Sequence, residues 1–234
     1  MPEFMKLTVI IPVYNEACLI EKVIERVKSV RLPANITKEI IIVDDGSTDG
    51  TLRLLKKYEG LPPIKIFYRN RNAGKTEAVK LGLEKSTGDI LLIQDADLEY
   101  NPDDYPKLLE PFIKYNASVV YGSRFMGAMT KMPLINRVAN IISNITLRLL
   151  FDTALTDVHT CYKLFKKEVF KDIKITSRNF TFDTEITTKL LKNGYKIFEV
   201  PIRYIARSKK EGKKITWLKA LEVYWGIIKY RFKD

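Results

Sequence analysis

Leu7-Thr-Val-Ile-Ile-Pro12 is a nearly continuous run of β-branched and apolar residues close to the N-terminus. Such a run is typical of a strand that is buried on both faces of a parallel sheet. The following segment, 16–30, predicts an amphipathic helix, because apolar residues recur in it at helical spacing. A buried strand followed by such a helix is the first half of a strand–helix–strand unit and indicates an α/β fold. The residues of the apolar stripe are Leu19, Ile20, Val23, Ile24 and Val27.

The alternation of strand and helix patterns continues along the chain, which predicts a doubly wound, mostly parallel central sheet. With 234 residues and 46% hydrophobic content, the chain can bury one substantial core, so we expect one domain with a C-terminal extension. Strands are predicted at 39–43, 64–68, 89–94 and 117–121, and helices at 50–58 and 74–86.

The positive charge of the chain lies entirely in its C-terminal half. Residues 1–123 contain 17 Lys and Arg against 18 Asp and Glu, a balance of −1. Residues 124–234 contain 23 against 10, a balance of +13, and the two sum to the net charge of +12. This polarity indicates an anionic partner on one side of the molecule: phosphate groups, nucleic acid or a lipid surface.

Two sequence features favour a cytoplasmic protein. Cys18 and Cys161 are the only cysteines, and their number and spacing indicate neither a disulfide framework nor a metal site. The N-terminus has no charged region followed by an apolar run and a cleavage site, so nothing in it suggests secretion.

Acidic residues follow three of the predicted strands at the point where each strand ends. Glu16 follows the first strand, Asp45 the second, and Asp95 and Asp97 follow the strand at 89–94. Ligands of open α/β sheets bind beyond the carboxyl ends of the strands. Three acidic clusters on one rim would repel one another unless they bound a metal ion or hydrogen-bonded a base and a ribose. No glycine-rich phosphate loop occurs, so a diphosphate would need a metal and cationic side chains.

Asp95-Ala-Asp97-Leu-Glu99 has the composition of a metal-binding loop. Carboxylates two residues apart, just after a strand, offer hard oxygen ligands to Mg²⁺ or Mn²⁺ and leave coordination positions for phosphate oxygens and water. Glu99 adds a third oxygen ligand at the same spacing. Such a metal would neutralise a diphosphate and stabilise a departing nucleotide.

Three motifs together resemble the family 2 glycosyltransferases of the GT-A fold. The chain is most similar to the dolichol-phosphate mannosyltransferases and the related polyprenyl-phosphate glucosyltransferases. The resemblance spans roughly 7–215 and implies a Rossmann-like GT-A nucleotide-sugar-binding domain over 5–215, with 216–234 as an amphipathic helix at the membrane interface. The motifs are Val9-Ile-Ile-Pro-Val-Tyr-Asn-Glu16, Ile42-Val-Asp-Asp-Gly-Ser-Thr-Asp-Gly-Thr51 and Gln94-Asp-Ala-Asp-Leu-Glu99.

The resemblance also implies roles for individual residues of the donor site. Asp97 and Glu99 would bind the metal, Glu99 standing where relatives often carry Gln. Asp95 and Ala96 would line the nucleotide-sugar pocket, and Arg124 matches a basic residue near the phosphates. The base and ribose would be held by Pro12, Tyr14, Glu16, Val43 and Asp45.

Three further segments resemble the family less closely or in part. Asn72-Ala-Gly-Lys75 resembles a turn that lies close to the nucleotide. Arg207-Ser-Lys-Lys-Glu-Gly-Lys-Lys-Ile215 resembles the acceptor loop, with Arg207 in place and Lys213 favoured over Lys214 as its lysine. Thr156-Asp-Val-His-Thr-Cys-Tyr-Lys163 departs from the family at His159 and Lys163. The catalytic residues that we expect are Asp97, Arg124, Arg207 and Lys213.

The expected reaction is an inverting, metal-dependent transfer of a hexose from GDP-mannose or UDP-glucose to a polyprenyl (dolichyl) phosphate. A phosphate oxygen is anionic at pH 7 and needs no general base, which argues against a proton-transfer role for His159. Arg124, Arg137, Arg207 and Lys213 are the cations available to balance its charge. The alternative acceptor is a hydroxyl of a saccharide or glycolipid, which would need a carboxylate base such as Asp183 or Glu185. The sequence leaves the donor base and the sugar open.

Two segments in the C-terminal half favour peripheral association with the cytosolic face of an anionic membrane. The segments 138–151 and 215–232 are apolar with scattered cations and aromatic residues, as interfacial helices are, although packing against the core would explain them equally well. Residues 203–219 contain seven cations and one acid, which favours anionic headgroups. No apolar run reaches the ~18–20 residues that span a bilayer.

Other classes of protein explain less of the sequence. A basic nucleic-acid-binding module without catalysis would account for the charge, but acidic clusters at three strand ends would repel phosphates, so we expect no nucleic-acid partner. A nucleotidyltransferase would begin with a glycine-rich basic loop where this chain has Pro-Val-Tyr-Asn-Glu. An inactive relative is disfavoured because the donor and metal motifs are all present.

Overall fold

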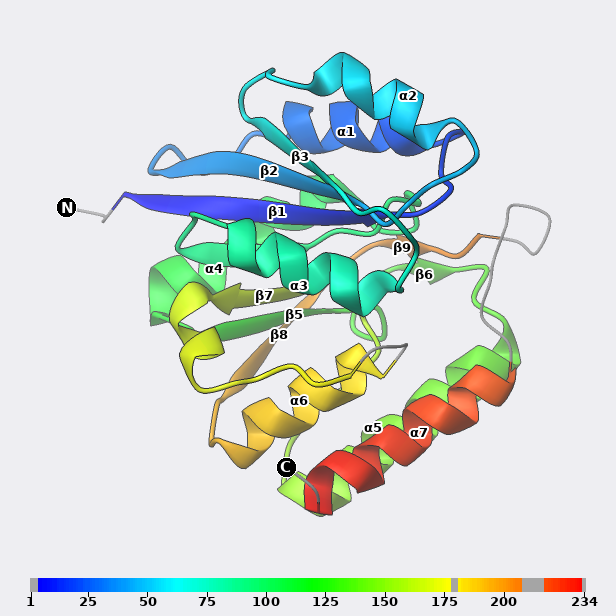
Figure 1. Cartoon of the computed structure of the whole chain (residues 1–234). Coiled ribbons are helices and arrows are strands. Elements are labelled where there is room, and N and C mark those ends of the chain that lie inside the picture. The colour runs from blue at the N-terminus through cyan, green and yellow to red at the C-terminus, as the bar shows by residue number, and fades with distance from the viewer. Residues whose placement is uncertain (1–3, 178–180, 208–216, 233–234) are drawn as a thin grey trace.

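A seven-stranded sheet in the order β3-β2-β1-β4-β7-β5-β8 forms the centre of the molecule (Figure 1). The computed structural model describes residues 4–177, 181–207 and 217–232, without the side chains of 217–223. A second sheet pairs the short strands β6 and β9. The strands are β1 (Met5–Val13), β2 (Ile36–Asp44), β3 (Ile64–Tyr68), β4 (Ile90–Ile93), β5 (Val119–Ser123), β6 (Met129–Thr130), β7 (Lys163–Lys166), β8 (Ile197–Pro201) and β9 (Tyr204–Ile205).

Helices connect most of these strands. The α-helices are α1 (Ile20–Ser29), α2 (Thr51–Leu55), α3 (Lys75–Lys85), α4 (Tyr105–Tyr115), α5 (Leu134–Phe151), α6 (Phe182–Lys192) and α7 (Trp217–Phe232). The 3-10 helices are η1 (Lys56–Tyr58), η2 (Pro102–Asp104) and η3 (Lys167–Lys171).

The mostly parallel α/β sheet that the sequence predicts is confirmed. Strands β3, β2, β1 and β4 are mutually parallel, and β5 and β8 are parallel to each other. The antiparallel strand β7 lies between β4 and β5. No sequence pattern indicated β7 or β8, because the strand–helix alternation weakens after residue 100.

Two predicted helices differ from the observed ones for local reasons. The first begins at Ile20 rather than residue 16, because Asn15 has a left-handed backbone (φ 53°) and the amides of Leu19 and Ile20 bond back to the carbonyl of Glu16. The predicted helix at 50–58 divides into α2 and the 3-10 helix η1. The buried stripe of α1 consists of Ile20, Val23, Ile24 and Val27, as the spacing predicts.

Alternate residues of β2 pack into different layers, as expected for a strand covered on both faces. Ile40 and Ile42 belong to the main core with the buried stripe of α1. Ile41 and Val43 pack with Ala78 of α3. Helices α1 and α2 therefore cover one face of this half of the sheet and α3 covers the other (Figure 1).

The strand directions bring distant segments to one edge of the sheet. Strands β1, β2, β4, β5 and β8 all end at this edge, and the antiparallel strand β7 begins there. The residues that follow Val13, Asp44, Ile93, Ser123 and Pro201 therefore meet the residues that precede Lys163. We call this the carboxyl edge; it contains the candidate site.

Helices α5 and α7 lie side by side beyond α6, away from the central sheet (Figure 1). Helix α5 begins four residues before the predicted segment 138–151. Leu147 of α5 and Ile227 of α7 pack together with Val158. No helix within the described part of the chain is long and apolar enough to cross a membrane.

Candidate active site

Asp45 holds the turn that precedes α3 against the end of β2. Its carboxylate accepts hydrogen bonds from the backbone amides of Ala73 (3.1 Å) and Gly74 (2.7 Å), and the Arg69 guanidinium lies 3.5 Å away. Burial raises the pKa of Asp45 above its ordinary value, although these hydrogen bonds oppose the rise. Asp45 therefore joins the second motif to the Asn72–Lys75 turn, a contact that the sequence did not predict.

Gly46 permits this close approach. Its φ is +74°, and a Cβ on Gly46 would lie 2.8 Å from the backbone carbon of Arg71. Any other residue would be strained in this left-handed conformation and would also push the 69–72 segment away.

Asp95 and Lys75 form an ion pair at the end of β4. The Lys75 ammonium also lies 3.5 Å from the Sγ atom of Cys161, which precedes β7. Burial would lower the pKa of Lys75, but the negative charge of Asp95 outweighs it and raises that pKa. The Lys75 side chain thus links the third motif, which contains Asp95, to the segment that precedes β7.

Arg207 bridges two of the acidic motifs. Its Nη1 and Nη2 atoms lie 3.2 and 3.3 Å from the two carboxylate oxygens of Glu16, and Nη2 donates to Oδ2 of Asp97 at 3.1 Å. The side chains of all three residues are only 16–17% exposed. The structure therefore brings together the first motif, the third motif and the start of the predicted acceptor loop.

Glu99 lies in the same cluster but faces β9. Its Oε1 accepts from the backbone amide of Arg207 (2.7 Å) and its Oε2 from the hydroxyl of Tyr204 (2.5 Å). The intervening Leu98 has a left-handed backbone (φ 59°), which sets Glu99 apart from Asp97. Glu99 thus holds β9 and the Arg207 backbone that follows it, a role that the spacing of Asp95, Asp97 and Glu99 does not reveal.

The surroundings of Asp97 shift its pKa strongly upward. Burial, and then the charges of Asp95 and Glu99, raise the pKa of Asp97 to about 7, although Arg207 opposes the rise. An elevated carboxylate pKa beside other carboxylates marks a place where additional positive charge is favourable.

The donor set fits a hard divalent cation, although in the described residues no group of three or more His, Cys, Asp or Glu is arranged to hold a metal. Mg²⁺ is commonly held by one or two carboxylates together with substrate phosphates, without a cage made by the protein alone. Asp97 and Glu16 already share one cationic group, Arg207. The Glu99 oxygens accept from Tyr204 and from the Arg207 amide, contacts that hold the backbone around β9. Oδ2 of Asp97 instead faces the side chain of Arg207 at the rim, so Asp97 is the better placed of the two predicted ligands.

Arg124 is buried beside the rim. Its guanidinium donates two hydrogen bonds of 2.7 Å to Asp157 and one of 3.3 Å to Asn140 of α5, and it lies 5.0 Å from the ring centroid of Tyr204. The Arg124 side chain is 7% exposed. Arg124 therefore contacts three parts of the chain: α5, the segment that precedes β7, and β9. Its position after β5 in the sequence does not indicate these contacts.

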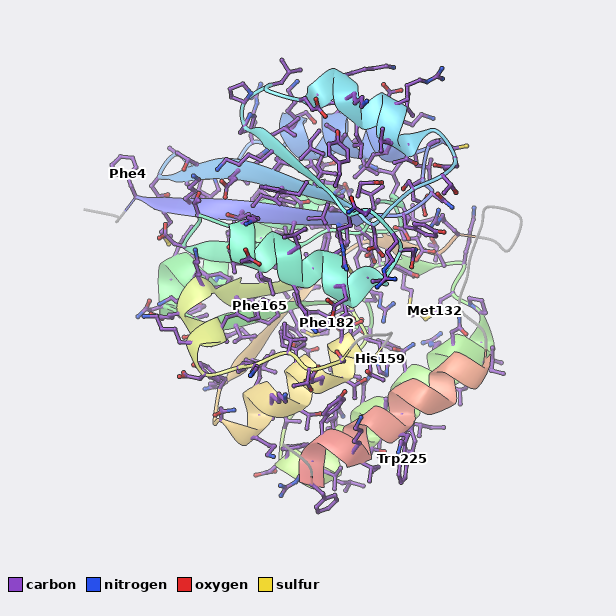
Figure 2. The ribbon with its side chains drawn as sticks, viewed as in Figure 1. Phe4, Met132, His159, Phe165, Phe182 and Trp225 are labelled. Carbon is purple, nitrogen blue, oxygen red and sulfur yellow. The ribbon has the colours of Figure 1, made fainter. Side chains whose placement is uncertain are left out.

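The segment before β7 is held by a buried lysine. Lys163 is fully buried and donates to Asp183 at the start of α6 (2.7 Å) and to the carbonyl of Val158 (3.0 Å). His159, labelled in Figure 2, lies in this segment. Burial lowers the pKa of His159 to about 4, so its imidazole is neutral and weakly basic at pH 7.

Glu185 is one of the two carboxylates that could serve as a base for a hydroxyl acceptor, but its side chain has a structural role. It is fully buried and accepts hydrogen bonds from Thr176, Ser177 and Lys189. Asp183, by contrast, keeps 26% of its side chain exposed. Of these two candidates, only Asp183 has a carboxylate that a ligand can reach.

The remaining predicted site residues differ in accessibility. Tyr14 is 36% exposed at the rim. The side chains of Pro12, Val43 and Ala96 are buried, so a nucleotide would meet these residues mainly through their backbone. Lys213, and its alternative Lys214, lie outside the described residues.

Comparison with known proteins identifies the family. The model of the glycosyl transferase family 2 matches residues 8–174, which include most of β1, all of β2 and β4, and all three acidic motifs. The chain belongs to glycosyl transferase family 2. This membership accounts for the position of the carboxylates at the carboxyl edge of an α/β sheet.

Two curated relatives of this family 2 glycosyltransferase have names that refer to dolichol phosphate and to polyprenol monophosphomannose. A dolichol-phosphate mannosyltransferase of Pyrococcus furiosus is 32% identical over 216 residues, 89% of this chain and 59% of the relative. A polyprenol monophosphomannose synthase of Mycolicibacterium smegmatis is 28% identical over 233 residues, 94% of this chain and 86% of the relative. The chain thus spans less than two thirds of the length of the first of these proteins.

Solved structures share its fold. Glucosyl-3-phosphoglycerate synthase of Mycobacterium tuberculosis, in complex with Mn²⁺, UDP and phosphoglyceric acid, has a TM-score of 0.74 at 18% identity, covering 98% of this chain and 80% of that chain. Mannosyl-3-phosphoglycerate synthase of Rubrobacter xylanophilus has a TM-score of 0.73 at 15% identity, covering 97% and 72%. At these identities the likeness concerns the GT-A-like fold.

Proposed function

We infer that this glycosyltransferase moves a hexose, with inversion and with the help of Mg²⁺ or Mn²⁺, from GDP-mannose or UDP-glucose to a polyprenyl phosphate. The observation that carries this proposal is the convergence of Glu16, Asp45, Asp95 and Asp97 at one edge of the sheet. Burial and the charges of Asp95 and Glu99 raise the pKa of Asp97, which favours additional positive charge there. The relatives' names favour a polyprenyl phosphate as the acceptor.

The donor end of the site would be organised by the protein's own side chains. Asp45 and the 72–75 turn that it holds form the wall nearest the base and ribose, together with Tyr14. Asp97, with Glu16 beside it, would hold the cation against the diphosphate. When bound, the cation supplies Lewis-acid stabilisation of the departing nucleotide. Lys75 neutralises Asp95 and thereby limits the repulsion that the diphosphate meets.

The acceptor end needs positive charge more than a base. A phosphate monoester oxygen is already ionised at neutral pH, so positioning and charge balance are the main tasks. Arg207 stands at the junction of donor and acceptor sides, and Lys213 follows it in the sequence. Arg124 would be a positioning residue that holds α5 and the segment before β7, because its guanidinium donates to Asp157 and Asn140. His159 would not serve as a base.

A hydroxyl acceptor is the alternative, and one observation favours testing it. Asp183 keeps an accessible carboxylate, and the Lys163 ammonium fixes its orientation. Burial would raise the pKa of Asp183, but the nearby Lys163 and Lys75 lower it. A lowered pKa makes this carboxylate a weaker base, which favours the phosphate acceptor over the saccharide hydroxyl.

We also propose that α5 and α7 form the surface that meets an anionic membrane. Seven apolar side chains of α5 are 41–82% exposed, and Trp225 of α7, labelled in Figure 2, points away from the body of the molecule and is 65% exposed. Contiguous exposed apolar surface of this kind is typical of interaction sites. The α5 residues are Leu134, Ile135, Val138, Ile141, Ile142, Ile145 and Leu149.

The proposed donor site is tested by calorimetric binding of GDP, UDP, GDP-mannose and UDP-glucose, each with Mn²⁺ and with EDTA. One nucleotide family should bind, and only when the cation is present. Product analysis with the preferred donor and a short polyprenyl phosphate then tests the acceptor, with a free saccharide and 3-phosphoglycerate as competing acceptors. Absence of binding by all four nucleotides would contradict the proposed function.

A further inference from the structure

The Arg207 guanidinium takes the place of a cation between two carboxylates. It makes a two-pronged contact with Glu16 at 3.2 and 3.3 Å and a third contact with Asp97 at 3.1 Å. Glu16 follows β1 and Asp97 follows β4, two adjacent strands of the sheet. The arginine therefore neutralises the site at which the proposed function places a divalent cation.

Both oxygen atoms of Asp97 already accept a hydrogen bond, one of them from Arg207. Its Oδ2 accepts from Nη2 of Arg207, and its Oδ1 accepts from the backbone amide of Glu99 at 3.1 Å. Mg²⁺ would approach a carboxylate oxygen to about 2.0–2.1 Å. The guanidinium in its present position would then face a second positive charge at contact distance, in a poorly solvated site where repulsion is strong.

The side chain of Arg207 can leave this position without disturbing its backbone. The Arg207 amide is held by Glu99, and the preceding strand β9 pairs with β6. Within the described part of the structure, the buried Nε of Arg207 has no hydrogen-bond partner. The contacts of the guanidinium are thus the two ion pairs, and its donor capacity is not fully used by the protein.

We propose that Arg207 and the divalent cation are alternative counter-ions of Asp97, and that the cation replaces Arg207 only when a nucleotide diphosphate binds. This inference rests on the proposed function. A diphosphate brings oxygen ligands for the cation and a new anionic partner for the displaced guanidinium, whose planar fork suits phosphate oxygens. Cation and nucleotide therefore bind cooperatively, and the cation alone binds weakly.

The test is calorimetric titration of Mn²⁺ into nucleotide-free protein, with Arg207→Gln compared with the wild type. Removal of the competing guanidinium should tighten Mn²⁺ binding about tenfold or more, which corresponds to about 1.4 kcal/mol. The added nucleotide should then strengthen Mn²⁺ binding less in the variant than in the wild type. Equal Mn²⁺ affinities in the two proteins, including no measurable binding by either, would overturn the proposal.

Arg203→Gln is the matched control for the loss of one positive charge. Arg203 lies four residues earlier and pairs with Asp104, away from Glu16 and Asp97. Its replacement should leave Mn²⁺ affinity within about twofold of the wild type. An equal gain in both variants would show that overall charge, and not competition at Asp97, controls cation binding, and would also refute the proposal.

Two further measurements keep the test decisive if Arg207→Gln folds poorly. Arg207→Lys retains the charge but cannot span both carboxylates, so its Mn²⁺ affinity should lie between those of the wild type and Arg207→Gln. In wild-type protein, Mg²⁺ with nucleotide should shift the NMR signal of the Arg207 Nε–H group, identified by its loss in Arg207→Lys. A signal unmoved at saturating Mg²⁺ and nucleotide would show that the guanidinium stays in place.

The failure of this inference is distinguishable from failure of the proposed function. If Mn²⁺ binding is unaffected by Arg207→Gln while a nucleotide sugar still binds with the cation, only the competition is refuted. If no nucleotide sugar binds under any condition, the proposed donor chemistry fails, and the nucleotide-free Mn²⁺ titrations still decide the competition at Asp97.

Discussion

At the scale of single residues, equal spacing does not give equal roles. Asp97 and Glu99 are two positions apart and look like two ligands of one metal. Leu98, with its left-handed backbone, turns Glu99 toward Tyr204 and the Arg207 amide, whereas Asp97 stays at the rim with Glu16. Sequence-based assignment treats the two carboxylates alike because side-chain direction after a strand depends on backbone turns that spacing does not encode.

Asp97→Asn should therefore be far more damaging than Glu99→Gln. Loss of the Asp97 charge removes the main cation ligand, so we expect transfer activity to fall by about 100-fold or more and the cation dependence of nucleotide binding to disappear. Glu99→Gln retains one oxygen acceptor and should lower activity about tenfold or less. Steady-state kinetics with the preferred donor measures both, and equal losses would contradict the distinction.

The pH dependence of cation binding follows from the raised pKa of Asp97. Burial and the neighbouring charges of Asp95 and Glu99 bring this pKa to about 7, and only the ionised carboxylate binds a cation. Mn²⁺ affinity should rise with pH up to about 7 and level off above it. Calorimetric titrations between about pH 5.5 and 8.5 measure this, and Asp97→Asn should remove the dependence; an unchanged profile in that variant would assign it to another group.

At the scale of elements, α6 combines one accessible acid with one structural acid in a single turn. Asp183 faces Lys163 and the segment before β7, while Glu185 is fully buried and ties α6 to Thr176 and Ser177. Burial alone would raise the pKa of Glu185, but hydrogen bonds from Lys189, Thr176 and Ser177 outweigh it and lower the pKa to about 2. Glu185 thus stabilises the folded state in its ionised form.

Glu185→Gln should reduce stability in a pH-dependent way. A pKa lowered from 4.5 to about 2 contributes stability that is fully present above about pH 4.5 and is lost as the pH falls toward 2. We expect the variant to lose on the order of 2 to 3 kcal/mol of unfolding free energy at pH 7, and less near pH 3. Urea unfolding at both pH values measures this; a deficit of equal size at both would contradict the charged role of Glu185.

At the scale of the whole molecule, the candidate active site and the proposed membrane surface lie in different parts of the structure. The acidic rim lies at the carboxyl edge of the sheet, while α5 carries seven exposed apolar residues and α7 carries the exposed Trp225 and Phe232. Asn140 and Asn144 on the opposite side of α5 bond to Arg124 and to the backbone of Val158. Helix α5 therefore connects the proposed membrane surface to the segment beside the candidate site.

Ile142→Glu should weaken vesicle binding without unfolding the protein. Ile142 is 49% exposed on α5, and its replacement removes about 1.5 kcal/mol or more of apolar contact with lipid and adds repulsion from anionic headgroups. Co-sedimentation with anionic lipid vesicles should show about a tenfold weaker partition.

Ile113→Glu is the matched control, because Ile113 is 42% exposed on α4, away from the proposed membrane surface. It should leave vesicle binding unchanged. Equal losses in the two variants would remove α5 from the membrane contact.

The sequence by itself determined the α/β class, the strands β1 to β5 and the acidic residues that follow β1, β2 and β4, because hydrophobic period and strand-end motifs are local properties. Only the tertiary structure decided which of those residues meet. Arg207 reaches Glu16 across 191 positions, and the antiparallel strand β7 between β4 and β5 brings Asp157 to Arg124 and Lys163 to Asp183. Such contacts depend on strand order and direction, which arise from packing of the whole chain and leave no local pattern.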